Sequence, residues 1–202
     1  MHGLLLAAGA GRRMGLPKAL LRDGRGGSFL LRAVALLAEG GCERVTVVLG
    51  ASSEEARAVL AGGGHVRDVE VVVAEDWAEG MGASLRAGLT AVAGSDADAV
   101  LVSLVDLPDV DEAVLRRVVA TGAPDGAAAL VRATYGGRPG HPVLLGRDHW
   151  AGVAATAHGD QGARAYLTDH GAVPCECGDL ATGRDVDRPD DLPESSDIGV
   201  ER

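Results

Sequence analysis

The chain has 202 residues, of which 47% are hydrophobic, 24% charged and 2% aromatic, a composition typical of a soluble globular protein and unlike a disordered or collagen-like chain. Its formal net charge is -10 at pH 7 and no basic stripe runs along it, which argues against nucleic acid as a partner. The apolar run from Leu4 to Ala10 is too short to span a bilayer and follows no Lys or Arg, so we expect no membrane association and a cytoplasmic location.

Short apolar runs alternate with longer segments of helical periodicity, a pattern that predicts an α/β fold built around a parallel sheet. Strands are expected at residues 3–7, 44–49, 69–73, 99–104, 128–133, 142–145 and 172–175. Helices are expected from about Ser28 to Gly40, from a cap at Ser52 or Ser53 to about Leu60, over 83–92 and 111–120, and near Arg147 and Gln161. The strands after Pro124 are expected to lie over one edge of the sheet.

The length suits a single domain, which we place at residues 1–192. Residues 193–202 are polar and unpatterned, so a disordered tail is expected there. The cysteines, Cys42, Cys175 and Cys177, form neither an even disulfide framework nor the spacing of a zinc site. We expect them to be free thiols.

A glycine-rich turn follows the first expected strand, and residues 6–18 read Leu-Ala-Ala-Gly-Ala-Gly-Arg-Arg-Met-Gly-Leu-Pro-Lys. Glycine lets backbone amides approach phosphate oxygens closely. A dinucleotide fingerprint would require glycine at Met14, and a P-loop would require Gly-Lys-Ser/Thr where Pro17 begins Pro-Lys-Ala. Arg13 and Lys18, the only lysine of the chain, are cations suited to a triphosphate, although such a turn can also be a plain surface loop.

Asp106 comes just after the expected strand 99–104 and is followed by Leu107 and Pro108. Open parallel sheets bind ligands outside the carboxyl ends of their strands, where magnesium is commonly held by one or two carboxylates. The alternative is that Asp106 only stabilises a turn or caps a helix. A second acidic segment, Asp185-Val186-Asp187-Arg188-Pro189, occurs near the end of the chain, where Asp187 could instead cap a final helix.

Three further segments contain closely spaced glycines. Residues 79–89 read Glu-Gly-Met-Gly-Ala-Ser-Leu-Arg-Ala-Gly-Leu, and in this segment Ser84 is either a helix cap or a ligand. Residues 136–143 read Gly-Gly-Arg-Pro-Gly-His-Pro-Val, and residues 159–164 read Gly-Asp-Gln-Gly-Ala-Arg. His141 could donate a hydrogen bond to a ligand, but a lone histidine is more often structural, and we do not expect it to be catalytic.

These motifs, in this order from about residue 3 to residue 192, resemble the MobA-like nucleotidyltransferases, the relatives of the molybdenum cofactor guanylyl- and cytidylyltransferases. The resemblance implies a Rossmann-like, three-layer α/β/α fold of the GT-A-like kind with a mostly parallel mixed sheet. It also implies magnesium-dependent attack by the terminal phosphate of molybdopterin on the α-phosphate of a nucleoside triphosphate, with release of pyrophosphate. A molybdoenzyme or its chaperone would be a further partner.

The same resemblance assigns roles to residues. Lys18, Arg13 and Asp106 are implied as catalytic, and Asp106 and Asp187 as ligands of Mg²⁺, with Arg188 where threonine is usual. The implied nucleotide-binding residues are Leu6, Ala7, Ala8, Gly9, Ala10, Gly11, Lys18, Gly80, Met81 and Ser84, with Gly82 where a serine is usual. The implied acceptor-binding residues are Gly140, His141, Asp160, Gly162 and Ala163.

Ala8 favours CTP over GTP, because Leu-Ala-Ala-Gly tends to accompany CTP in the family and Leu-Ala-Gly-Gly tends to accompany GTP. The alternatives are a guanylyltransferase acting on the molybdenum cofactor or on a deazaflavin precursor, and a sugar-phosphate nucleotidyltransferase. A carrier of finished cofactor is the alternative that is not an enzyme.

Overall fold

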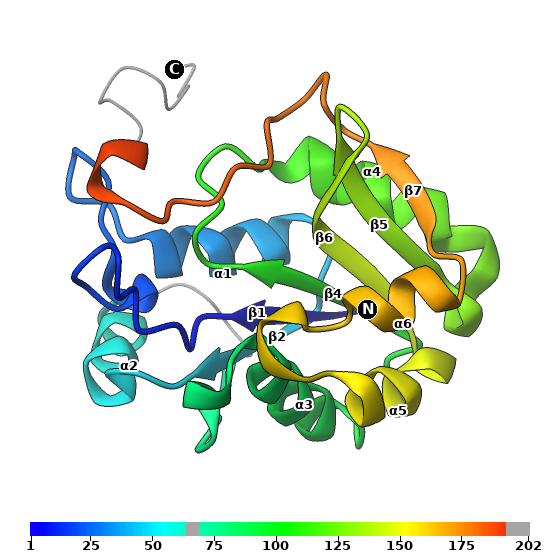
Figure 1. Ribbon diagram of the computed structural model, residues 1–202, viewed down its shortest axis with the longest axis horizontal. Helices are drawn as coiled ribbons and strands as arrows, with labels where there is room; N and C mark the ends of the chain where they lie inside the picture. Colours follow the sequence, from blue (N-terminus) through cyan, green and yellow to red (C-terminus); the bar gives the residue numbers. More distant parts are fainter. Residues whose placement is uncertain (64–68, 193–202) are drawn as a thin grey trace.

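The computed structural model describes residues 1–63 and 69–192, so the tail expected at 193–202 lies outside the described residues. The described residues form a sheet with helices packed on both sides (Figure 1). The strands are β1 (His2–Leu6), β2 (Arg44–Leu49), β3 (Val69–Val73), β4 (Ala99–Leu104), β5 (Leu130–Tyr135), β6 (Arg138–Gly146) and β7 (Val173–Glu176). The α-helices are α1 (Phe29–Glu39), α2 (Ser53–Gly62), α3 (Met81–Val92), α4 (Glu112–Gly122), α5 (Arg147–Thr156) and α6 (Arg164–Asp169). Short 3-10 helices are η1 (Lys18–Leu20), η2 (Trp77–Glu79), η3 (Ala123–Ala128), η4 (Gly159–Gln161) and η5 (Pro189–Asp191).

The sheet has the strand order β3-β2-β1-β4-β6-β5-β7. Strands β3, β2, β1 and β4 are parallel, whereas β6 runs antiparallel to both β4 and β5. The chain builds outward from β1 through β2 to β3 and then returns to place β4 on the other side of β1. The strand order therefore reverses between β1 and β4, and open α/β sheets bind their ligands outside the carboxyl ends of the strands at such a switch point.

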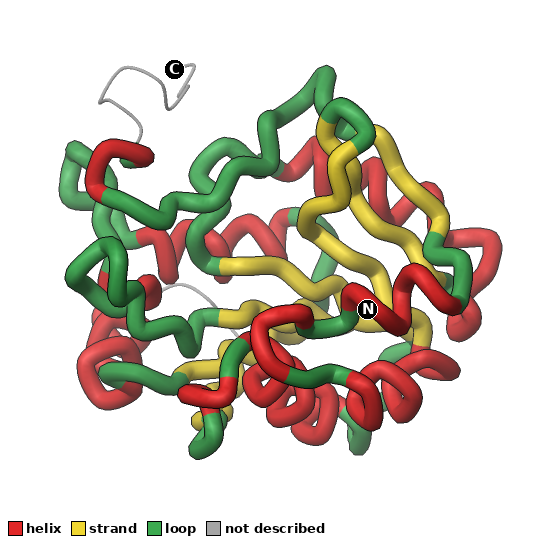
Figure 2. Tube along the Cα trace, in the orientation of Figure 1, coloured by secondary structure: helices red, strands yellow, loops and turns green. Residues whose placement is uncertain are grey.

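The helices form two layers, one on each face of the sheet (Figures 1 and 2). One core cluster includes apolar residues of α1 and α4, and the other includes residues of α3, α5 and α6. Side chains of β1 alternate between them, because Leu5 faces the first cluster and Leu4 and Leu6 face the second. Both faces are covered, which explains why residues 3–7 form an unbroken apolar run. The expected three-layer α/β/α fold with a mostly parallel mixed sheet is confirmed.

Strand β6 is longer than expected, since it begins at Arg138 and not at residue 142. Pro139 and Pro142 lie within it, and proline usually disfavours a strand because it lacks an amide donor. The β5–β6 hairpin turns at Gly136 and Gly137, whose positive φ angles of 57° and 74° suit glycine. The strands after Pro124, β5, β6 and β7, form one edge of the sheet, as expected.

Two serines that the sequence offered as possible caps make no cap hydrogen bond. Helix α3 begins at Met81 with Gly80 at its N-cap, so Ser84 lies inside the first turn and caps nothing. Ser52 occupies the N-cap position of α2 but makes no side-chain cap hydrogen bond. Ser28 and Asp111 do cap α1 and α4, accepting hydrogen bonds from the amides of residues 31 and 114 at 3.4 and 3.1 Å.

The three cysteines are buried and free, as expected. Within residues 1–63 and 69–192, no helix combines the length and the apolar character that crossing a bilayer would require.

Candidate active site

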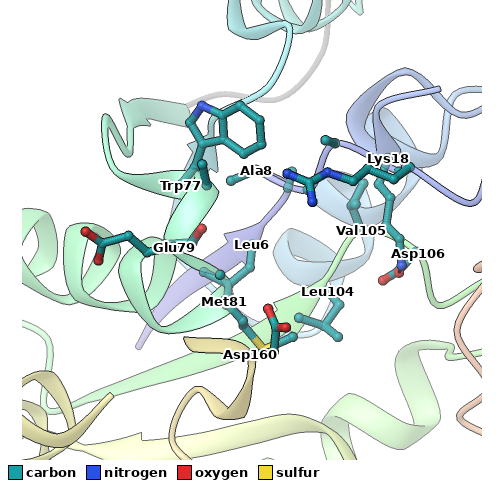
Figure 3. A pocket seen from close by; sticks show the side chains of 18 residues that line it. Leu6, Ala8, Lys18, Trp77, Glu79, Met81, Leu104, Val105, Asp106 and Asp160 are labelled. Carbon is teal, nitrogen blue, oxygen red and sulfur yellow. Dashed lines mark hydrogen bonds and ion pairs between the residues drawn. The ribbon is translucent and has the colours of Figure 1, made fainter. Parts of the chain in front are cut away.

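The principal cavity lies at the carboxyl ends of β1 and β4, where the strand order reverses. Its volume is about 400 Å³, within the usual range for small-molecule sites. Three segments and one further residue line it: Leu6, Ala7, Ala8, Gly9, Ala10, Gly11, Arg12 and Lys18; Trp77, Ala78, Glu79, Gly80, Met81 and Ser84; Leu104, Val105 and Asp106; and Asp160. Trp77 stands on one side and the Lys18–Asp106 pair on the other (Figure 3). All the residues proposed from sequence to bind nucleotide therefore meet in one cavity.

The turn after β1 offers hydrogen-bond donors to this cavity. Its path is fixed by the Lys18 amide, which donates to the Gly9 carbonyl at 3.1 Å, and by the Gly15 amide, which donates to the Gly11 carbonyl at 2.8 Å. Gly11 has a φ of +56°, and a Cβ there would lie 1.9 Å from the Leu16 carbonyl oxygen, so only glycine fits. The amides of residues 8–11 donate to no other described residue. They are therefore available to an anion, as the backbone amides of glycine-rich phosphate-binding turns are.

A cluster of three carboxylates lies beside the turn. Asp106, Asp185 and Asp187 each place an oxygen within 4.8 Å of the other two, and Asp106 is 4% exposed. The Lys18 ammonium lies between Asp106 and Asp187, donating to Asp106 at short range and to Asp187 at 2.7 Å. Arg13, at 72% exposure, donates to Asp187 at 3.2 Å from the outside. Both cations expected at the triphosphate thus contact the carboxylates expected to bind metal.

The pKa values of this cluster follow from burial and mutual charge. Burial raises the pKa of Asp106 above its ordinary value, although the neighbouring Lys18 ammonium partly offsets the effect. Burial alone would lower the pKa of Lys18, but the charges of Asp106 and Asp187 outweigh it and raise that pKa. The hydrogen bond from Lys18 lowers the pKa of Asp187. Lys18 is therefore held as an ammonium ion.

The donor set fits a hard divalent cation. Carboxylate oxygens are the ligands that magnesium and manganese prefer, and in the described part of the chain two cations, Lys18 and Arg13, form ion pairs with acidic side chains of this cluster. The position between Asp106 and Asp187 already attracts a positive group, because the ammonium of Lys18 occupies it.

The opposite wall of the cavity presents Trp77, Met81 and Ser84. Ser84 is 5% exposed, and its hydroxyl makes no hydrogen bond to another described residue, which leaves it free for a ligand. Gly82, where the family motif has serine, does not line the cavity. A Cβ there would lie 2.7 Å from the His158 amide nitrogen, so the close packing of α3 against the segment before η4 requires glycine at this position.

The residues expected to bind the acceptor are divided between two places. Asp160 lines the principal cavity, whereas His141 and Ala163 line a second, smaller cavity next to it. Gly162 packs against the Met81 side chain, and Gly140 packs against the ring of Tyr135 and accepts a hydrogen bond from Arg132. Arg13 and Asp187 do not line the principal cavity. Asp187 contacts Lys18, which does line it, and Arg13 contacts Asp187.

Sequence reasoning missed Trp77, Arg12 and Asp185. A signal for Asp185 was available, because residues two apart in an extended chain share a face and Asp185 and Asp187 are such a pair. Trp77 precedes the motif that begins at Glu79, and no local pattern distinguishes it from a packed tryptophan.

A glycine turn open to phosphate, a carboxylate cluster and a cleft at the strand switch point define a nucleotide-using α/β transferase. Residues 3–173 match the model of the MobA-like NTP transferase domain, and the chain belongs to this family of nucleotidyltransferases.

Two curated relatives are each 36% identical to the chain. One is a nicotine blue oxidoreductase from Paenarthrobacter nicotinovorans, aligned over 92% of this chain and 91% of its own length. The other is a probable molybdenum cofactor guanylyltransferase from Opitutus terrae, aligned over 56% of this chain and 51% of its own. Among solved structures, Rv0371c from Mycobacterium tuberculosis is 29% identical with a TM-score of 0.74 over 94% of both chains. A complex of Rv0371c with manganese is similar with 27% identity and a TM-score of 0.65, covering 87% of this chain and 86% of that one.

Proposed function

We propose that the protein transfers a nucleotidyl group, CMP from CTP, to the terminal phosphate of a molybdopterin-type acceptor. The observation that carries this proposal is the meeting, in one 400 Å³ cavity, of unpaired turn amides and the Lys18–Asp106 pair of the acidic cluster. A relative named as a probable molybdenum cofactor guanylyltransferase supports the acceptor class.

The reaction needs no nucleophile from the protein. An oxygen of the acceptor phosphate forms a bond to the α-phosphorus of the nucleotide, the bond between that phosphorus and the α,β-bridging oxygen breaks, and pyrophosphate leaves with the electron pair. Positioning and charge neutralisation are therefore the main contributions required of this chain. The amides of residues 8–11 hold the triphosphate, and Arg12, which lines the cavity, adds positive charge to it.

We propose that Asp106, Asp187 and Asp185 hold Mg²⁺. When bound there, the ion supplies Lewis-acid neutralisation of charge on the α-phosphate. Lys18 then has a second role, because an ammonium displaced from between Asp106 and Asp187 can turn toward the phosphates that lie over the same turn. The manganese complex of a similar protein supports a divalent cation in this fold.

We propose the preference for CTP from the packing of Ala8 and Trp77, which line the cavity beside the glycine-rich turn. Ala8 lines the cavity and is 4% exposed, and its methyl group lies on the side where Trp77 stands (Figure 3). A Cβ built on Gly50 would lie 2.6 Å from the Trp77 Cβ and 2.9 Å from the Ala8 Cβ, so these residues pack closely together. A methyl group here takes space that a purine would need, which favours the smaller base.

The test is calorimetric titration with CTP and with GTP in the presence of magnesium, followed by measurement of pyrophosphate release with molybdopterin. Asp106→Asn should abolish metal-dependent nucleotide binding, whereas Asp96→Asn, which removes an exposed carboxylate from the loop before β4, should bind as the wild type does. Tighter binding of GTP would overturn the cytidylyl assignment and leave nucleotidyl transfer standing. Absence of binding with both nucleotides would overturn the transfer itself.

A second candidate is an oxidoreductase, because the relative that aligns over 92% of this chain is named nicotine blue oxidoreductase. The same preparations distinguish the two. An oxidoreductase would oxidise NADH or NADPH in the presence of an electron-accepting substrate and release no pyrophosphate from CTP or GTP.

A further inference from the structure

A second cavity, here called the basic cavity, adjoins the principal one. Leu6 and Met81 line both, so the two spaces are neighbours across these side chains. Arg132 of β5, His141 of β6 and Arg164 of α6 are the basic residues in its lining, which is otherwise apolar except for Gln161. The cavity measures about 30 Å³, enough for an oxygen or two and too small for a ring system.

The two arginines of the basic cavity lack acidic partners. Four other arginines, Arg13, Arg86, Arg116 and Arg117, form ion pairs with Asp or Glu, but no ion pair among the described residues includes Arg132 or Arg164. Arg132 donates from Nε to the Gly140 carbonyl at 3.2 Å, and its terminal nitrogens have no partner in the described chain. No Asp or Glu lines the basic cavity.

The positive charges in the basic cavity lower the pKa values of their neighbours. Burial lowers the pKa of Arg132, and the positive charge of Arg164 lowers it further. Burial and the charge of Arg132 lower the pKa of His141 to about 4, so the imidazole is neutral near pH 7. Two cations thus face one cavity without a counterion, although the chain carries a formal net charge of -10. Arg132 is partly buried whereas Arg164 is exposed, so the cost of uncompensated buried charge applies to Arg132, and an anion bound beside it would reduce that cost.

The basic cavity lies near the carboxyl end of β4, beside the principal cavity. Strand β6 is antiparallel to β4 with Val102 opposite Val143, so two residues further on His141 lies level with Leu104. Leu104 is two residues before Asp106 and lines the principal cavity. The basic cavity is therefore placed on the β6 side of the acidic cluster, away from the glycine turn that precedes Lys18.

We propose that Arg132 and Arg164 bind the phosphate monoester of the acceptor and hold it beside the nucleotide. Guanidinium groups present paired donors that match phosphate oxygens, and two of them can hold a dianion from two sides. A neutral His141 adds no third positive charge, and its ring can donate to or accept from the phosphate. This inference rests on the proposed transfer to a phosphorylated acceptor, and it assigns the binding of that phosphate to residues outside the nucleotide cavity.

The test uses the full chain, radiolabelled inorganic phosphate as the probe and equilibrium dialysis at low ionic strength. Binding is measured without nucleotide and again with magnesium and saturating α,β-methylene CTP, which occupies the triphosphate cradle. The wild type should retain bound phosphate when the analogue is present. Arg132→Gln and Arg164→Gln should each weaken this binding roughly tenfold, whereas Arg57→Gln, an exposed arginine of α2, should leave it unchanged.

Displacement of all bound phosphate by the analogue would overturn the proposal, because the phosphate would then belong to the triphosphate cradle. Unchanged phosphate affinity in both arginine variants would overturn it equally. If the wild type bound neither CTP nor GTP, the proposed transfer would fail, and the dialysis without nucleotide would still test the basic cavity through the same variants.

In an active preparation, Arg164→Gln should raise the KM for the acceptor roughly tenfold and leave the KM for the nucleotide unchanged. A purely structural role would instead change both constants together.

Discussion

The backbone amide of Val186 donates a hydrogen bond to the backbone carbonyl of Asp106 at 2.9 Å. The Val186 side chain is 1% exposed and belongs to the same core cluster as α1 and α4. Its neighbours Asp185 and Asp187 are on the opposite face of the extended segment and meet Asp106. In Figure 1 this late segment returns from β7 to the loop that follows β1. One buried valine thus anchors two of the three acidic residues.

Replacing Val186 with alanine should loosen that anchor. We expect a loss of about 1 to 3 kcal/mol in the free energy of unfolding, from the buried methyl groups removed, and weaker binding of Mn²⁺ because Asp185 and Asp187 are less well positioned. Chemical denaturation and metal titration measure the two effects. Val173→Ala, at a side chain 44% exposed, is the control and should alter neither. Retention of full metal affinity in Val186→Ala would show that the anchor is unnecessary.

Substituting alanine at Gly11 and at Gly15 distinguishes backbone strain from a steric clash of the added methyl group. Both have positive φ, +56° and +77°, but a Cβ on Gly11 would meet the Leu16 carbonyl at 1.9 Å, whereas one on Gly15 meets nothing within 4 Å. Gly15→Ala should cost about 1 to 2 kcal/mol from backbone strain alone. Gly11→Ala should cost more and should also abolish nucleotide binding, because the turn must move. Similar nucleotide affinities for the two variants, measured by calorimetry, would argue against a phosphate cradle at residues 8–11.

Trp77 provides an optical test of where the base binds. The chain has two tryptophans, so in a Trp150→Phe background Trp77 is the only one. CTP with magnesium should quench its fluorescence by stacking, and Trp77→Ala in the wild-type background should weaken binding roughly tenfold, in line with about 1 to 3 kcal/mol per stacked base. Trp77→Phe should restore most of the affinity. Unchanged fluorescence at saturating nucleotide would place the base elsewhere.

The basic cavity makes stability depend on pH. In the unfolded chain His141 titrates near 6.5, whereas burial and the charge of Arg132 lower its pKa to about 4 in the folded protein. Between these values the unfolded chain binds a proton that the folded chain does not, so the free energy of unfolding falls as the pH decreases from about 6.5 toward 4.

His141→Gln removes this contribution. Because His141 as a whole residue is only partly buried, we expect the wild type to lose about 1 to 2 kcal/mol more than the variant between pH 7 and pH 4.5. Urea denaturation at several pH values gives the difference. Parallel curves for the two proteins would contradict the lowered pKa.

Much of the fold could be predicted because its signals are local. The apolar runs at residues 44–49 and 99–104 have the same first and last residues as β2 and β4. A buried parallel strand bounded by polar turns can be recognised from a few consecutive residues. The glycine-rich turn could be predicted in the same way, because the positive φ angle and the close backbone contact at Gly11 require glycine. Strand β6 was underestimated because Pro139 and Pro142 locally argue against a strand.

Local patterns in the amino-acid sequence were enough to predict the α/β class, the position of the glycine-rich turn and the placement of Asp106 after a strand. Folding, and no local pattern, places Lys18 between Asp106 and Asp187, residues 88 and 169 positions away along the chain. It likewise brings Arg132 and Arg164 to one cavity without a carboxylate. The physical reason is that such meetings depend on strand order, register and the return of the chain across the sheet. Periodicity within one segment fixes which face is buried, but it carries no information about which distant segment packs there.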